Sequence, residues 1–121
     1  MESLLCKLTL VYPTDANDRI VEVLVNLDPP ISGFTTWAGE GHGFGFSKAS
    51  VSERVRGRVK RTILVAVLPR TSVPRLLAVV ADKAPVPHLT YWIEPVESFA
   101  QLQRQAPVQI APVASTAGKV P

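Results

Sequence analysis

The first residues of the chain alternate between hydrophobic and other positions. The apolar series at a spacing of two consists of Leu4, Cys6, Leu8, Leu10 and Tyr12. Because successive side chains of a strand point to opposite faces, this period is typical of a strand with one buried face. We therefore expect a strand over residues 4–12, ended by a proline, with Cys6 as a small buried hydrophobic residue.

Two later stretches repeat at helical spacing. Their apolar positions are Ile20, Val23, Leu24 and Leu27 in the first, and Val73, Leu76, Leu77, Val80, Ala81 and Ala84 in the second. Spacings of three, four and seven place these side chains on one face of a helix. Thr14 or Asp15 is positioned to cap the first helix, and Thr71 or Ser72 the second. We expect the first helix to end near Asp28, before two consecutive prolines.

Three further strands are predicted between and after the helices. Residues 33–38 form a short candidate, residues 62–68 (TILVAVL) a continuous aliphatic run, and residues 89–94 (LTYWIE) a run rich in aromatic residues. The continuous run suits a central strand, because both of its faces would be covered.

This order of elements predicts an α+β protein of the ferredoxin-like βαββαβ type. Its antiparallel sheet carries both helices on one face, with a long loop between the second and third strands. The other face then needs a cover. The apolar groups expected on it are Phe34, Trp37, Tyr91 and Trp92, so we expect the chain to self-associate.

Composition narrows the organisation of the chain. With 121 residues, 46% of them hydrophobic, it is long enough for one domain, which we assign to residues 1–99. Residues 100–121 shift to Gln, Ala, Pro and Val without periodicity, and we expect a disordered C-terminal tail. The start of the chain resembles neither a signal peptide nor a membrane span. A single cysteine fits a reducing compartment, so we expect a cytoplasmic protein.

Candidate chemistry is concentrated between the second and third expected strands. In the stretch SERVRGRVKR, residues 52–61, Arg54, Arg56, Arg58 and Lys60 lie at a spacing of two. An extended backbone would project all four from one face, which favours a bound anion or an acidic partner. Gly57 would let a backbone amide approach the bound group. A solvated row of charges that discourages strand pairing is the alternative.

Other kinds of chemistry have weaker support. His42 is a candidate metal ligand, together with carboxylates, but no pair of potential ligands has a recognised metal-binding spacing. The run GHGFGF, residues 41–46, is similar to the base-stacking signature of RNA-recognition motifs, which makes Phe44 and Phe46 candidate RNA contacts. No catalytic signature is present in the sequence, so we predict no enzymatic activity.

The loop and the order of elements resemble a known family. EGHGFGF at the start of the loop, ERVRGR at its end and the closing YWIEPV resemble the PII-like signalling proteins, relatives of the nitrogen-regulatory PII and CutA proteins. The most similar group is that of the small, largely uncharacterised proteobacterial PII-like proteins, often encoded near heavy-metal efflux systems. The resemblance covers residues 4 to about 96.

The resemblance implies a homotrimer in which the long loops sense ligands and contact partners. PII proteins bind nucleotides between subunits, partly through a glycine-rich loop after the second helix. Here that segment reads ADKAPVPH and contains no glycine, so the ATP-binding loop of PII proteins is missing and the cofactor is unknown, with a nucleotide or a metal both open. The residues that match the loop base are Gly41, His42, Gly43, Glu53, Arg54, Arg56, Gly57 and Arg58.

The sequence therefore predicts a non-enzymatic PII-like regulatory protein. It would bind an anion or nucleotide and a partner protein, such as a membrane transporter or efflux component, through the loop. A metal-binding or metal-tolerance protein acting through His42 is the second hypothesis, and an RNA-binding module is the third.

Overall fold

The computed structural model describes residues 4–42 and 59–102 of the chain. In chain order its elements are β1 (Leu5–Pro13), the 3₁₀ turn η1 (Thr14–Ala16), α1 (Asn17–Val25), β2 (Thr35–Gly41), β3 (Val59–Pro69), the 3₁₀ turn η2 (Arg70–Ser72), α3 (Val73–Lys83) and β4 (Thr90–Pro95).

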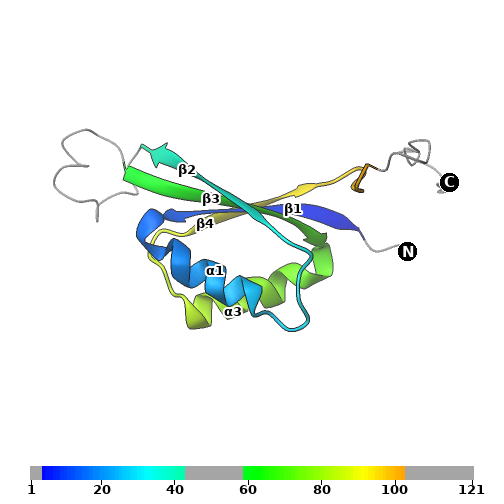
Figure 1. Cartoon of the computed structure of the whole chain (residues 1–121), viewed down its shortest axis with the longest axis horizontal. Coiled ribbons are helices and arrows are strands. Elements are labelled where there is room, and N and C mark those ends of the chain that lie inside the picture. Colours follow the sequence, from blue (N-terminus) through cyan, green and yellow to red (C-terminus); the bar gives the residue numbers. More distant parts are fainter. Residues whose placement is uncertain (1–3, 43–58, 103–121) are drawn as a thin grey trace.

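The strands form one antiparallel sheet in the order β2-β3-β1-β4. Both helices lie side by side against the same face of this sheet, as Figure 1 shows. This is the ferredoxin-like α+β arrangement that the sequence predicts. The aliphatic run occupies β3, which together with β1 forms the centre of the sheet.

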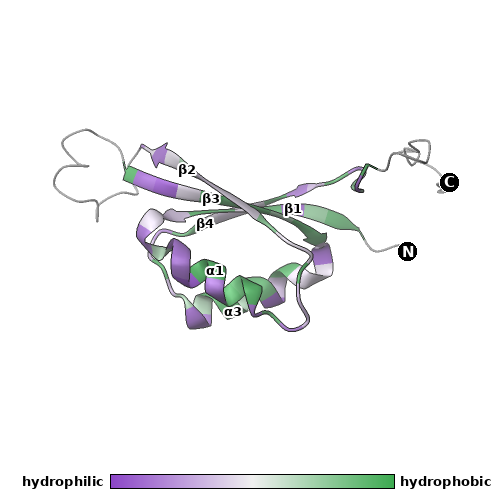
Figure 2. Ribbon diagram, viewed as in Figure 1, coloured by the Kyte–Doolittle hydropathy of each residue, from purple (hydrophilic) through white to green (hydrophobic). Residues whose placement is uncertain are grey.

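The hydrophobic core lies between the sheet and the two helices. The apolar stripes of α1 and α3 face the sheet, and Figure 2 shows polar residues on the outer sides of both helices. The largest fully buried side chains are Tyr12, Leu8, Leu10, Ile20, Leu24, Leu64, Leu68, Leu76 and Cys6. The predicted buried face of the first strand is therefore confirmed from Cys6 to Tyr12, whereas Leu4 is exposed. The predicted stripes of both helices are confirmed except at Ala81, which is exposed.

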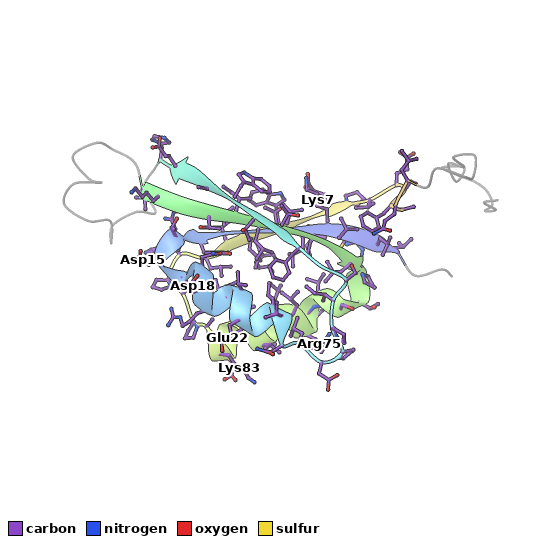
Figure 3. All side chains as sticks on the ribbon, viewed as in Figure 1. Lys7, Asp15, Asp18, Glu22, Arg75 and Lys83 are labelled. Atoms are coloured by element: carbon purple, nitrogen blue, oxygen red, sulfur yellow. The ribbon has the colours of Figure 1, made fainter. Side chains whose placement is uncertain are left out.

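Strand register assigns each residue of the sheet to one of two faces. Leu10 pairs with Leu64 and Tyr91 and belongs to the helix-covered face, whereas Thr9 pairs with Val65 and Trp92 and belongs to the opposite face. We call this opposite face the open sheet face. Lys7, which has the same parity as Thr9, points away from the helices in Figure 3.

The open sheet face has fewer aromatic residues than predicted. Trp37 pairs with Ile63 and lies on this face, as Trp92 does. Tyr91 instead has the parity of the helix-covered face, and Phe34 packs against the hydrophobic core. The prediction was wrong for these two because adjacent residues of a strand point in opposite directions, and because Phe34 precedes the strand.

β2 and β3 extend further than the sequence indicates. β2 begins two residues later than predicted, at Thr35. It continues to Gly41 because β3 begins at Val59 and so supplies a pairing partner for every β2 residue as far as Gly41. A Cβ atom on Gly39 would lie 2.7 Å from Cδ1 of Ile63, so glycine lets that side chain cross the strand. Glycine lowers strand propensity, so the local sequence does not predict that β2 continues to Gly41.

The helices begin and end differently from the prediction. α1 starts at Asn17 after η1, with Ala16 at its N-cap, and ends at Val25. Ser72 is at the N-cap of α3, as predicted, but no side-chain hydrogen bond caps either helix. In both cases a 3₁₀ turn leads directly from the strand into the helix, which replaces the side-chain cap.

The last described residues, 96–102, follow β4 without helix or strand. Residues 100–102 of the predicted tail belong to this segment, and residues 103–121 lie outside the described part of the chain. Figure 1 shows that the segment continues in the direction of β4 and away from the two helices.

Candidate functional site

Both ends of the predicted loop leave the sheet at the same place. Gly41, the last residue of β2, pairs with Val59, the first residue of β3. His42 follows Gly41 and is exposed. The pairing of β2 with β3 therefore brings the two residues that flank positions 43–58, His42 and Val59, to one end of the sheet.

The turn after β1 belongs to the same end and is bound to the sheet by side chains. The hydroxyl of Tyr12 donates a hydrogen bond of 2.7 Å to Oδ1 of Asn17. The hydroxyl of Thr62 donates one of 3.2 Å to Oγ1 of Thr14. Burial raises the pKa of Tyr12 to about 12, since the charged phenolate is poorly solvated in the core. These two hydrogen bonds hold η1 against the sheet, at the end of the sheet where β2 finishes and β3 begins.

The connection from α3 to β4 also reaches this end, because Thr90, the first residue of β4, pairs with Val11 near the end of β1. His88 in this connection has φ 64°, a left-handed conformation that is uncommon for residues other than glycine. In Figure 1 this connection, η1 and the ends of β2 and β3 gather at the same end of the molecule.

Two basic residues, Lys60 and Arg61, follow Val59 at the start of β3. Lys60 is exposed and pairs with Glu40, whereas Arg61 is only 4% exposed and pairs with Gly39 and Pro13. Val59 is buried and Lys60 is exposed, and as neighbours on a strand they lie on opposite faces, while the other members of the basic row lie outside the described residues. Arg61 was missed as a buried residue. Its parity places it with Ile63 and Val65 on the open sheet face, where those two side chains are only partly buried, so the alternation along the strand does not predict its burial.

The structure therefore places two of the predicted site residues, Gly41 and His42, at the base of the loop. The others lie outside the described residues: Gly43, Glu53, Arg54, Arg56, Gly57 and Arg58, together with Phe44 and Phe46 of the RNA hypothesis. Their assignment to a site stays a prediction.

The described ranges contain no preformed metal centre. Within residues 4–42 and 59–102, no three His, Cys, Asp or Glu side chains are grouped so that they could hold an ion. Cys6 is fully buried in the core, as predicted, and so is not available as a surface ligand. His42 stays a candidate only in combination with residues of the loop.

The open sheet face is a second feature that the sequence predicts in part. Trp37 and Trp92 are about half exposed, at 51% and 46%, and they lie on β2 and β4, the two edge strands. Between them are partly buried aliphatic side chains of β1 and β3. One ion pair crosses the face, with Nζ of Lys7 3.6 Å from Oε1 of Glu94. No described element covers this face, as Figure 1 shows.

Two grooves border the helices and were not predicted. The first, of about 500 Å³, lies between α1 and α3 and contains charged side chains of both signs. At its rim the guanidinium of Arg75 donates hydrogen bonds to the carbonyl oxygens of Asp28 and Pro29, at 3.3 and 3.0 Å. The second, of about 420 Å³, is mostly apolar and lies between α3, the α3–β4 connection and β4.

The fold and the loop end define a small ferredoxin-like α+β protein with one uncovered sheet face. In the described ranges no helix is long and apolar enough to cross a membrane. No curated protein sequence is significantly similar to the chain. The chain belongs to the family described as "Protein of unknown function (DUF3240)", whose model matches residues 2–103.

Solved structures show the same fold. A DUF3240 family protein from Shewanella baltica OS155 is similar with a TM-score of 0.68 and 22% identity, over 84% of this chain and 100% of that one. A functionally unknown protein from Pediococcus pentosaceus matches with a TM-score of 0.56 and 11% identity, over 84% and 100% of the two chains. A Bacillus cereus protein related to NIF3 matches with a TM-score of 0.60 and 13% identity, over 79% of this chain and 26% of that one.

Proposed function

We propose that this protein is a cytoplasmic PII-like regulatory protein without enzymatic activity. It assembles as a homotrimer and binds a small anion or a nucleotide through residues 41–58. Ligand binding changes the conformation of this segment, which then engages a partner protein. The resemblance to PII-like proteins suggests a membrane transporter or efflux component as this partner.

The observation that carries the proposal is the position of the segment between β2 and β3. Its two ends are held together by the pair of Gly41 and Val59, next to η1 and the α3–β4 connection. A segment of sixteen residues anchored at both ends can change its conformation without disturbing the core. Order–disorder switching of such a segment is an established way to couple two binding events.

The charge of the segment supports an anionic ligand. Arg54, Arg56 and Arg58 lie shortly before β3, and the exposed Lys60 follows at the same spacing. Guanidinium groups bind phosphate and carboxylate groups through paired hydrogen bonds. The ligand class that fits this set is therefore a phosphate- or carboxylate-bearing small molecule.

The uncovered sheet face supports self-association. Two half-exposed tryptophans at its opposite edges, with aliphatic residues between them, leave apolar surface that a second copy could bury. Most oligomers of identical chains are closed and symmetric, and a trimer is what the resemblance implies.

A thermal-shift screen tests the ligand part of the proposal. The probes are adenine nucleotides, inorganic phosphate, bicarbonate, and copper, zinc and cobalt ions. A ligand that binds only the folded state stabilises it by about 2.7 kcal/mol at a hundredfold excess over Kd. We expect at least one anion to raise Tm of the wild type by several degrees, with a much smaller rise for Arg54→Ala, Arg56→Ala and Arg58→Ala.

Arg70→Ala is the matched control, since Arg70 is exposed and follows β3 at the opposite end of the sheet. It should retain the full shift. If the three loop variants bind every probe as the wild type does, the proposal fails. A shift with a metal ion that is lost in His42→Ala would instead support the metal-binding hypothesis.

A further inference from the structure

The apolar groove beside β4 has the form of a receptor for a short hydrophobic segment. Six residues form most of its wall, namely Leu77, Val80, Ala81, Ala84, Leu89 and Tyr91. None of these side chains is charged, whereas the groove between α1 and α3 contains several charges. An uncharged groove of this kind gains free energy from burying apolar side chains.

The backbone next to the groove is also open to a partner. β4 is an edge strand that pairs with β1 alone among the described strands. Its outer side therefore presents backbone groups to which an extended segment can add by β-pairing. The groove and the strand edge together form one surface that can bind both side chains and backbone.

The segment just after β4 exposes two large apolar side chains. We call residues 96–102 the arm. Phe99 is 56% exposed and Leu102 is 81% exposed, although both side chains are strongly hydrophobic. They are three residues apart on a segment without helix or strand. Two large exposed apolar side chains on an irregular segment are an arrangement that a binding partner would stabilise.

The arm and the groove lie at opposite ends of β4 within one molecule. Tyr91, in the groove, pairs with Leu10, whereas Pro95, which precedes the arm, pairs with Cys6. Tyr91 and Pro95 are four positions apart along the strand, which separates them by roughly 13 Å. In Figure 1 the arm continues away from the start of β4 instead of turning back toward it.

We propose that the groove between α3 and β4 receives the arm of a second copy of this chain, with Phe99 and Leu102 as its apolar anchors. Each copy then contributes one arm and one groove, which makes the contact heterologous. Heterologous contacts close into a ring when the rotation between subunits permits it. The contact is separate from the open sheet face and does not depend on the proposed ligand.

Cysteine cross-linking between two preparations tests the inference while both anchors stay in place. One preparation carries Ala100→Cys beside Phe99, and the other carries Ala81→Cys at the exposed rim of the groove. Native Cys6 is fully buried and remains in both. After mixing and mild oxidation, we expect a disulfide-linked dimer that joins the two variants, identified by mass spectrometry of the linked peptides.

Ala78→Cys provides the matched control, since Ala78 is exposed on the same helix but does not line the groove. Its cross-linking to Ala100→Cys should be at least tenfold weaker. Adding Phe99→Ser and Leu102→Ser to the arm should reduce the specific product to the level of this control.

Two results would overturn the inference. One is cross-linking to Ala81→Cys that does not exceed the Ala78→Cys control, as expected if a different segment or protein occupies the groove. The other is an Ala81→Cys/Ala100→Cys double variant that closes a disulfide within a single chain instead of between chains. Neither result bears on ligand binding by residues 41–58, which the thermal-shift screen measures separately.

Discussion

At the scale of single residues, Tyr12 shows how burial and one hydrogen bond act together. Its ring is fully buried at the end of β1, and its hydroxyl donates to Asn17 at the start of α1. Burial raises the pKa of its phenol from 10.0 to about 12. The folded protein therefore favours the neutral form, and the stabilisation from this preference is present below pH 10 and lost as the pH rises to about 12.

The variant Tyr12→Phe tests this contribution. Losing the hydrogen bond and leaving the Asn17 oxygen without its donor should lower the free energy of unfolding by about 1 kcal/mol at neutral pH. Between pH 10 and 12 the wild type should lose up to about 2 to 3 kcal/mol that the variant does not lose. Urea denaturation across this range measures both. Parallel pH profiles of the two proteins would show that Tyr12 does not titrate as described.

Gly39 is a second position where one residue determines local structure. Its missing side chain leaves room for Ile63 to lie across β2. In the sequence this glycine is one of several in a glycine-rich stretch, and nothing local distinguishes it. The pairing of β2 with β3 reveals its role.

At the scale of elements, Arg75 joins α3 to the segment between α1 and β2. Its two terminal nitrogens bind successive carbonyl oxygens, those of Asp28 and Pro29, in the fork geometry that guanidinium groups favour. Sequence periodicity indicates where both helices lie but says nothing about this bond, because its partners are 46 and 47 residues away in the chain.

Replacing Arg75 should loosen the entry into β2. We expect Arg75→Ala to lower the free energy of unfolding by about 1 kcal/mol, since the hydrogen bonds are exposed to water. The free energy of unfolding of Arg75→Lys should lie between those of Arg75→Ala and the wild type, because an ammonium group cannot reproduce the paired hydrogen bonds of the guanidinium. Chemical denaturation gives these values. Arg19→Ala, an exposed change beside the same groove, is the control, and an equal loss in both variants would contradict the assigned role.

Both proposals also belong in part to the scale of elements. The pairing of β2 with β3 brings Gly41 and Val59 together on either side of residues 43–58, and β4 separates the arm from the groove of the same molecule. In each case the position of the feature follows from strand pairing, which the local sequence does not specify.

At the scale of the whole molecule, the open sheet face decides how copies of the chain are expected to associate. Trp37 and Trp92 lie on edge strands that are 55 positions apart in the sequence, yet they belong to the same face. The two faces of the sheet therefore differ in how far they are covered. One is closed by α1 and α3, and the other presents half-exposed tryptophans to the surroundings.

Charges on the open sheet face should dissociate the proposed homotrimer. We expect Trp37→Glu and Trp92→Glu to shift the protein toward the monomer, because a buried unpaired carboxylate is strongly unfavourable in a subunit contact. Size-exclusion chromatography with light scattering measures the mass. Val25→Glu introduces the same charge at a 61% exposed residue on α1 and should leave the mass unchanged. A monomeric wild type, or tryptophan variants that keep its mass, would remove the open sheet face as an interface.

The site was less predictable than the fold because its components come from separate parts of the chain. His42 and Gly41 were assigned to the loop base through the resemblance of the loop to that of PII-like proteins. The burial of Arg61 depends on the register of β3 against β1 and β2. The two grooves depend on how α3 packs beside α1 and β4, which no single stretch of sequence records.

The sequence by itself determined the number and kinds of elements, the buried face of each helix and the ferredoxin-like order of strands. It could do so because a period of two or of three to four is a local property of the chain. The tertiary structure decided where β2 ends, which aromatic residues occupy the open sheet face, and where the arm lies relative to the groove. These features depend on pairing and packing between residues that are distant in sequence, so they follow from the register of the strands and not from the pattern along the chain.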